Sequence, residues 1–240
     1  MATVTAGKYG IIYAESDLGW SPGVRTATSG NSLWNQTTST NINTVQAAYS
    51  SGSKGSVWIV VRMFLAFNVT AYQTGYTLSD MRLYYVPTTS TAGSSGAGMK
   101  MALVKSTAQG NANTNLTVSD FNNFDDSVDY AANDGSQNNT WRDLSSLQYV
   151  DLNATAITAI TGTGYLKICI MEYLFDYPNT APTVNPTAMK AYGNFGSTVP
   201  YLSFTATAAG YGNNIIGVEA GSIGDVISVS RSDISEVIGV

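Results

Sequence analysis

The sequence predicts an all-β protein, an antiparallel jelly-roll β-sandwich with a short repetitive C-terminal tail. Three observations indicate this class: apolar or alternating strand segments, turns rich in Gly, Asn and Pro, and few helical patterns. Strands joined without crossover helices form antiparallel sheets, and a jelly roll folds such sheets without long open edges. We expect residues 1–208 to form the sandwich, residues 209–214 a hinge and residues 215–240 a repetitive assembly or attachment tail.

The strongest strand signal covers residues 57–69, VWIVVRMFLAFNV. Because this run is apolar without clean alternation, it predicts a central strand covered on both faces. A second strand is expected over 81–86, where Pro87 stops it. Alternation predicts three more strands, a half-buried one over 99–103 and others over 165–173 and 201–206. Their inward residues are expected to include Met101, Leu103, Leu166, Ile168, Ile170, Leu202 and Phe204.

Helices are expected only as short turns. Residues 118–124 and 154–160 fit one turn or two, with Ser119 and Asn153 as candidate N-caps. The Gly- and Ser-rich residues 89–98 predict a flexible loop.

Composition limits the classes of function. Only 11% of residues are charged, against about 25% in ordinary soluble domains, so neutral polar residues make the surface. The net charge of −5 and the scattered basic residues argue against a nucleic-acid partner. Histidine is absent, which excludes a Ser-His-Asp triad and His-ligated zinc. The single cysteine, Cys169, lies in an apolar run and is expected in the core.

Neither export nor membrane insertion is expected. The N-terminal residues lack the apolar core of a signal peptide, and no segment is long enough to span a membrane.

Two kinds of ligand site can be considered. Asp125, Asp126 and Asp129 form an acidic cluster that could supply oxygen ligands to Ca²⁺, although the spacing does not match an EF-hand and a solvated loop is favoured. No two carboxylates can be paired as glycosidase catalysts, so we expect no enzyme and no required cofactor. Exposed aromatic rings could stack on sugars or instead cap the core. The candidates are Trp20, Trp34, Tyr72, Tyr76 and Trp141.

The C-terminal 26 residues repeat with a period of eleven, beginning at Ile215, Val226 and Val237. One such unit is too small to bury its own apolar face, so it must stack on neighbours. We expect the tail to bind other copies or a partner protein, with Gly210, Gly212 and Asn213 as the hinge. The expected interface residues are Ile215, Ile216, Val218, Ile223, Val226, Ile227, Val229, Ile234, Val237 and Ile238.

The order of several short motifs resembles a family of jelly-roll domains. The chain carries RMFLAFNVTAY, then GYTLSDMRLYYVP, a glycine-led strand followed by an aspartate, and a closing VPYLSF. This order over residues 5–208 is similar to carbohydrate-binding modules of disaggregatase-like and DNRLRE-type proteins. The matching positions are Arg62, Leu65, Phe67, Leu83, Tyr85, Gly164, Asp176, Pro200, Leu202 and Phe204. Met81 stands where the family usually has Ala, and Asn68 where it usually has Asp.

The resemblance implies a function in a virus particle. Versions of this domain occur in structural proteins of tailed bacteriophages, and the tail is similar to C-terminal repeats of phage virion proteins. We therefore expect a non-enzymatic virion protein in a fibre, decoration or receptor-binding role, assembled in the host cytoplasm. Its expected partners are itself, with a trimer favoured, and other virion proteins, and it could also bind a host-surface glycan weakly.

Two alternatives remain open. The domain could be a bacterial extracellular or cell-surface carbohydrate-binding module, or a filament subunit that polymerises by donating its tail to the next copy.

Overall fold

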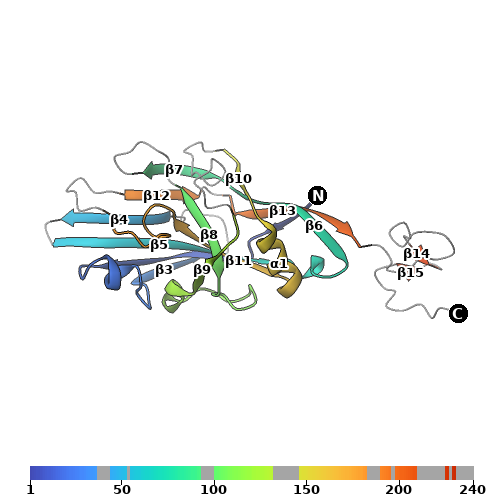
Figure 1. Ribbon diagram of the computed structural model, residues 1–240, viewed down its shortest axis with the longest axis horizontal. Coiled ribbons are helices and arrows are strands. Elements are labelled where there is room, and N and C mark those ends of the chain that lie inside the picture. Colours follow the sequence, from blue (N-terminus) through green and yellow to red (C-terminus); the bar gives the residue numbers. More distant parts are fainter. Residues whose placement is uncertain are drawn as a thin grey trace.

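A computed structural model describes residues 1–36, 44–52, 55–92, 100–131, 146–182, 190–195, 198–209, 225–226 and 229–230. Two antiparallel sheets pack against each other as a β-sandwich (Figure 1), which confirms the predicted all-β, jelly-roll-like class. None of the helices in these ranges is long and apolar enough to cross a membrane.

The smaller sheet has the strand order β1-β13-β6-β10. Its strands are β1 (Ala2–Thr5), β6 (Tyr76–Tyr85), β10 (Gln148–Asp151) and β13 (Tyr201–Ala208). Strand β6 therefore lies between β13 and β10, and both pair with it antiparallel.

The larger sheet is built around β5 (Gly55–Asn68). Strand β2 pairs with one edge of β5, while β4 and β11 share the other edge, so the sheet forks. Beyond the fork, β12 and β7 follow β4, β8 and β9 follow β11, and β3 pairs with β2. These strands are β2 (Lys8–Ser16), β3 (Ser32–Gln36), β4 (Thr44–Gly52), β7 (Pro87–Ala92), β8 (Met101–Ser106), β9 (Phe124–Asp129), β11 (Tyr165–Glu172) and β12 (Lys190–Phe195).

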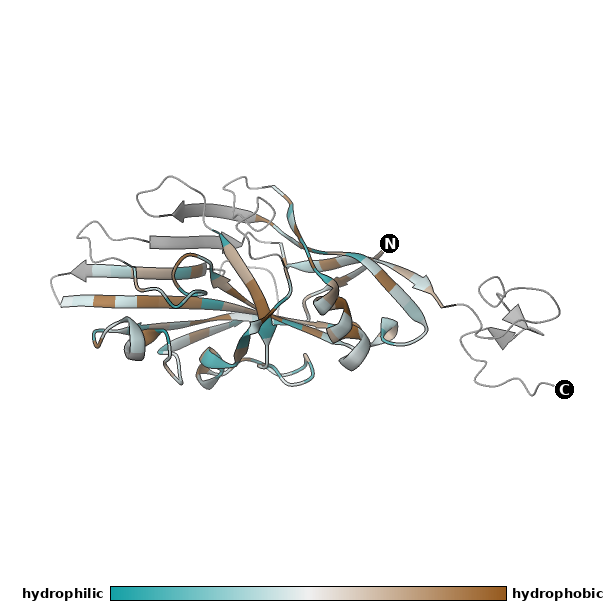
Figure 2. Ribbon diagram, viewed as in Figure 1, coloured by the Kyte–Doolittle hydropathy of each residue, from teal (hydrophilic) through white to brown (hydrophobic). Residues whose placement is uncertain are grey.

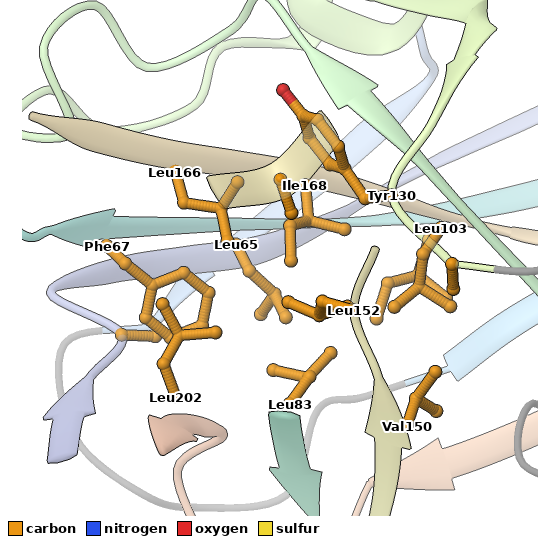
Figure 3. Packing of buried hydrophobic residues seen from close by; sticks show 14 of the residues in the cluster. Leu65, Phe67, Leu83, Leu103, Tyr130, Val150, Leu152, Leu166, Ile168 and Leu202 are labelled. Atoms are coloured by element: carbon orange, nitrogen blue, oxygen red, sulfur yellow. The ribbon is translucent and has the colours of Figure 1, made fainter. Parts of the chain in front are cut away.

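Hydrophobic residues recur along β5 (Figure 2) and are buried on both of its faces, as predicted for a central strand. Those facing the smaller sheet join an inner core between the two sheets. In Figure 3, Leu83 of β6 and Leu202 of β13 lie opposite Leu65 and Phe67 of β5. The labelled members of the inner core are Leu65, Phe67, Leu83, Leu103, Tyr130, Val150, Leu152, Leu166, Ile168 and Leu202.

A second, outer core covers the opposite face of the larger sheet. Phe64 of β5, Val104 of β8 and Cys169 of β11 lie in it, so the prediction of a buried Cys169 is confirmed. The expectation that 99–103 is half-buried is wrong, because the outer core covers the second face of β8. Two short helices contribute to this cover, η1 (Trp20–Val24) and η3 (Val118–Asn122).

The helical predictions hold in part. Helix α1 (Ala154–Thr163) begins at Asn153, whose Oδ1 accepts from the backbone N–H groups of Thr155 and Ala156 at 3.0 and 3.3 Å. The predicted Asn153 cap is thus confirmed. Helix η3 is capped by Thr117 and not by Ser119, because Thr117 and Asp120 form a reciprocal capping box. A further short helix, η2 (Thr70–Tyr72), lies beside the end of α1.

Two further expectations concern the loop and the tail. Residues 89–92 belong to strand β7 and not to a loop, because β7 pairs with β12; residues 93–98 lie outside the described residues. In the tail, β14 (Asp225–Val226) and β15 (Val229–Ser230) form a two-stranded sheet separate from the two larger ones.

Candidate functional site

The outer face of the smaller sheet carries a row of three tyrosines, one from each of three adjacent strands. Tyr84 of β6 is directly opposite Tyr149 of β10 and Tyr201 of β13. The rings of Tyr84 and Tyr201 are parallel with centroids 5.0 Å apart, and those of Tyr84 and Tyr149 are 5.5 Å apart. We call Tyr84, Tyr149 and Tyr201 the tyrosine row.

Strand alternation puts these rings on the outside. Leu83, Val150 and Leu202 are neighbours of the three tyrosines in sequence and are buried in the inner core. Successive side chains of a strand point to opposite faces, so the tyrosines must face outward. Tyr149 is 40% exposed, and the other two are half-buried against each other.

A charged pair lies beside the row. Arg82 and Asp151 are opposite each other on β6 and β10, and Arg82 Nε donates to Asp151 Oδ1 at 2.8 Å. The guanidinium also lies over the ring of Tyr149, 4.5 Å from its centroid. Hydrogen bonds to Tyr84 and to Asp151 raise the pKa of Arg82, which keeps this charge fixed on the face.

Such a face can bind a carbohydrate. Aromatic rings present flat apolar surfaces with a polar hydroxyl at the edge, which suits contact with sugar rings. Arg82 and Asp151 add a donor and an acceptor for sugar hydroxyl groups. Since strands are about 5 Å apart, the row extends roughly 10 Å, which suits several linked sugar rings better than one.

The predicted aromatic candidates that the structure describes do not gather at this face. Of the two alternatives for Trp20, the structure supports core packing and not sugar stacking: the residue is only 5% exposed and packs in the outer core, where its Nε1 donates to Asn179 Oδ1 at 3.2 Å. Trp34 is 40% exposed on β3 in the larger sheet. Trp141 lies outside the described residues.

Tyr72 and Tyr76 do lie together, with ring centroids 5.4 Å apart. Tyr72 also meets the edge of Phe204 in the inner core at 5.1 Å, so it caps the end of that core. Tyr76 is 39% exposed. This pair is a smaller aromatic surface than the tyrosine row and has no parallel stacking.

The acidic cluster is not a loop, because Asp125, Asp126 and Asp129 belong to β9. Each carboxylate has its own partner: Lys105 Nζ lies 4.0 Å from Asp125, Arg25 Nη2 lies 3.1 Å from Asp126, and the Tyr177 hydroxyl donates to Asp129. The hydrogen bond from Ser127 lowers the pKa of Asp125.

No group of three His, Cys, Asp or Glu side chains that could hold a metal ion occurs among the residues that the structure describes. Asn138 and Asn139 follow the acidic cluster in the sequence and could add amide oxygen ligands, but they lie outside those residues.

A buried ion cluster, unforeseen from the sequence, joins both arginines of the outer core to one aspartate. Arg62 binds the Asp176 carboxylate through Nε and Nη2 at 2.9 and 2.8 Å, and Arg25 Nε lies 2.8 Å from the same carboxylate. The Arg62 guanidinium also lies over the rings of Phe121 and Phe124. The side chains of Arg62 and Asp176 have no exposed surface, so the cluster ties η1, β5 and η3 to residues 173–179 and offers no site for a ligand.

Glu172 is equally buried at the end of β11. Its carboxylate accepts from the backbone N–H groups of Leu174, Phe175 and Asp176, which shapes the turn after the strand. Burial raises the pKa of Glu172 to about 7, against the opposing effect of those three hydrogen bonds. No substrate could reach this carboxyl group.

Most of the predicted interface residues cannot be placed. Val226 and Val229 pair with each other across β14 and β15. The hinge residues 210–214 lie outside the described residues, as do Ile215, Ile216, Val218, Ile223, Ile227, Ile234, Val237 and Ile238.

Neither a comparison with protein-family models nor one with curated proteins finds a match for this chain.

Proposed function

We propose that the protein is a non-enzymatic structural and binding component of a virus particle. The sandwich body binds a glycan chain through the tyrosine row. The C-terminal repeats join the body to further copies of itself, as a trimer, or to another protein of the particle.

The tyrosine row is the observation that carries the binding part of this proposal. Three aromatic rings in register on one solvent-facing sheet have no role in either core, since Leu83, Val150 and Leu202 fill the core behind them. An exposed aromatic surface flanked by a fixed charge pair is typical of a recognition site. The buried positions of Glu172 and Asp176 support a non-enzymatic function, because neither carboxylate is accessible to a substrate.

The repeats support assembly. The strands β14 and β15 pair in a sheet of their own, and the ten expected interface residues of the tail are all aliphatic. Their burial between copies would supply roughly 10–20 kcal/mol of gross apolar free energy, at about 0.8 kcal/mol per methylene group. Ordering the tail offsets part of this gain.

The virus setting rests on the family resemblance and on the similarity of the tail to virion repeats. A bacterial extracellular carbohydrate-binding module would use the same tyrosine row, and a filament subunit would use the same tail. End-to-end polymers of the purified protein that vanish without residues 209–240 would favour the filament.

Binding is tested by a glycan array followed by calorimetry with the best oligosaccharide. Tyr84→Ala removes the central ring of the row and should weaken binding at least about tenfold, a loss of about 1.4 kcal/mol. Trp34→Ala is the control, because it removes an exposed aromatic ring from the other sheet and should leave the affinity unchanged. The proposal would be contradicted if no bacterial surface glycan on the array binds, or if Tyr84→Ala binds the best oligosaccharide with unchanged affinity.

A further inference from the structure

A pocket with a volume of about 290 Å³ opens at the junction of α1, β8, β9 and β11. The volume is at the lower end of the range of about 300–1,000 Å³ typical of small-molecule sites, so a single sugar-sized ligand would fill it. The lining residues are Lys105, Ser106, Val128, Tyr130, Thr155, Thr158, Ala159, Thr163, Tyr165 and Lys167.

The charged side chains that line the pocket are all positive. The lining contains two lysines and no carboxylate. Burial lowers the pKa of Lys167 and the positive charge of Lys105 lowers it further, while the negative charge of Asp120 partly opposes both effects. Lys105 and Lys167 line the same pocket, and an anion bound between their ammonium groups would offset the repulsion between the two like charges.

Both lysines keep donors for a ligand. Lys167 Nζ donates to the Gly110 carbonyl at 2.7 Å, which uses one of its three N–H groups. Lys105 is 45% exposed and lies 4.0 Å from Asp125, at the limit of an ion pair. The chain thus holds Lys167 in place without saturating either charge.

The rest of the lining has a mixed character. Val128, Ala159 and the ring of Tyr130 provide apolar contact, and Figure 3 shows the Tyr130 hydroxyl pointing away from the aliphatic residues of the inner core. The hydroxyls of Thr158 and Thr163 donate to backbone carbonyls of α1, so toward a ligand they act as acceptors. Thr163 Oγ1 already accepts from the Tyr165 backbone N–H, which leaves it one lone pair for a ligand. Apolar walls, hydroxyl acceptors and two cations together match a polyhydroxylated ring with a negative charge.

We propose that this pocket binds a monosaccharide-sized acidic sugar, whose carboxylate lies between Lys105 and Lys167 and whose hydroxyl groups meet Thr158 and Thr163. The site is separate from the tyrosine row, because its lining comes from α1 and the larger sheet. Binding at the pocket and binding at the tyrosine row can therefore be tested independently.

Calorimetric titration of the full chain tests the pocket with glucuronate, galacturonate and N-acetylneuraminate as probes, and with glucose and inorganic phosphate as comparison ligands. At least one acidic sugar should bind at millimolar concentration, about tenfold more tightly than either comparison ligand, with an affinity that falls as salt is added. Lys167→Gln and Lys105→Gln should each weaken binding about tenfold or more. Lys8→Gln changes a half-buried lysine outside the pocket, whose Nζ donates to Asn115 Oδ1, and should have no effect.

Several results would overturn the proposal. They are no binding of any acidic sugar, phosphate binding as tight as theirs, or full affinity in both pocket variants. Lys167→Arg keeps the charge and should retain part of the affinity, which separates loss of the site from loss of the fold. Tyr84→Ala should bind the acidic sugar normally, so failure of the tyrosine row and failure of the pocket give different results.

Discussion

Replacing Arg62 by methionine should destabilise the protein far more than the same change at Arg82. Both arginines form an ion pair at 2.8 Å, Arg62 with Asp176 and Arg82 with Asp151. The first pair is fully buried, whereas the side chains of the second are 40% and 48% exposed. The two substitutions therefore differ in burial and not in the length of the bond that is lost.

The magnitude follows from the contacts of Arg62. Besides the bidentate pair, its guanidinium donates to the carbonyls of Phe121 and Arg25 at 3.0 and 2.9 Å. Removing one partner of a buried pair costs about 3–5 kcal/mol. Arg25 Nε still faces Asp176 at 2.8 Å, so we expect the lower end, about 3 kcal/mol. The exposed pair of Arg82 is screened by solvent, so its loss should cost much less.

Thermal and chemical unfolding of the two variants measures this difference. For a chain of this size each kcal/mol lowers the melting temperature by about 2–4 °C, so Arg62→Met should melt roughly 10 °C below the parent protein. Arg82→Met should melt within about 3 °C of it. Equal shifts in the two variants would show that burial does not govern the strength of these pairs, and the reasoning would fail.

The other predictions concern pH, a helix end, assembly and binding. The pKa of Glu172 is about 7 in the folded state against 4.5 in the unfolded state. The folded state therefore binds more protons between pH 4.5 and 7. The free energy of unfolding should fall by up to about 3 kcal/mol as the pH rises through this window. Denaturant titrations should show this fall in the parent and not in Glu172→Gln; parallel pH profiles would refute it. Gly164→Ala should lower stability by about 1–3 kcal/mol, because φ of Gly164 is +74° and a Cβ there would lie 2.6 Å from a neighbouring side chain. In the control Gly162→Ala the new Cβ contacts nothing, so this substitution should raise stability by up to about 1 kcal/mol. Light scattering should give an oligomer for the full chain and a monomer for residues 1–208; two monomers would exclude assembly through the tail. Tyr84→Phe keeps the ring and should retain most of the glycan affinity, and a loss as large as that of Tyr84→Ala would show that stacking is not the main contact.

Sequence patterns predicted those features that depend only on residues close together in the chain. The run over 57–69 predicted β5 and its two buried faces, because hydrophobic residues without alternation must be covered on both sides. Asn153 was a reliable cap, since its side chain needs only the first turn of α1. Alternation likewise placed Leu202 and Phe204 inward.

The tyrosine row could not be predicted, because it depends on strand order. Residues 84, 149 and 201 meet only because β6 lies between β10 and β13, and no local pattern encodes that order. The outward direction of each tyrosine could be predicted, because each one follows or precedes an inward-facing aliphatic residue. The same limit applies to Arg62 and Asp176, which are 114 residues apart in the chain.

For the acidic cluster, closeness in sequence suggested a shared site that the fold does not form. Asp125, Asp126 and Asp129 are close in sequence, but adjacent side chains of a strand point to opposite faces. Asp126 therefore reaches Arg25, while Asp125 lies on the side of Lys105. Proximity in sequence indicates a shared site only when the backbone conformation is known.

The glycan-binding face is tested most directly by nuclear magnetic resonance with labelled tyrosine and tryptophan rings. The protein would be titrated with the oligosaccharide that binds best on the array. The ring signals of Tyr84, Tyr149 and Tyr201 should shift together and saturate, while that of Trp34 stays constant. Saturable shifts confined to Trp34, or none at the three tyrosines, would contradict the assignment of this face.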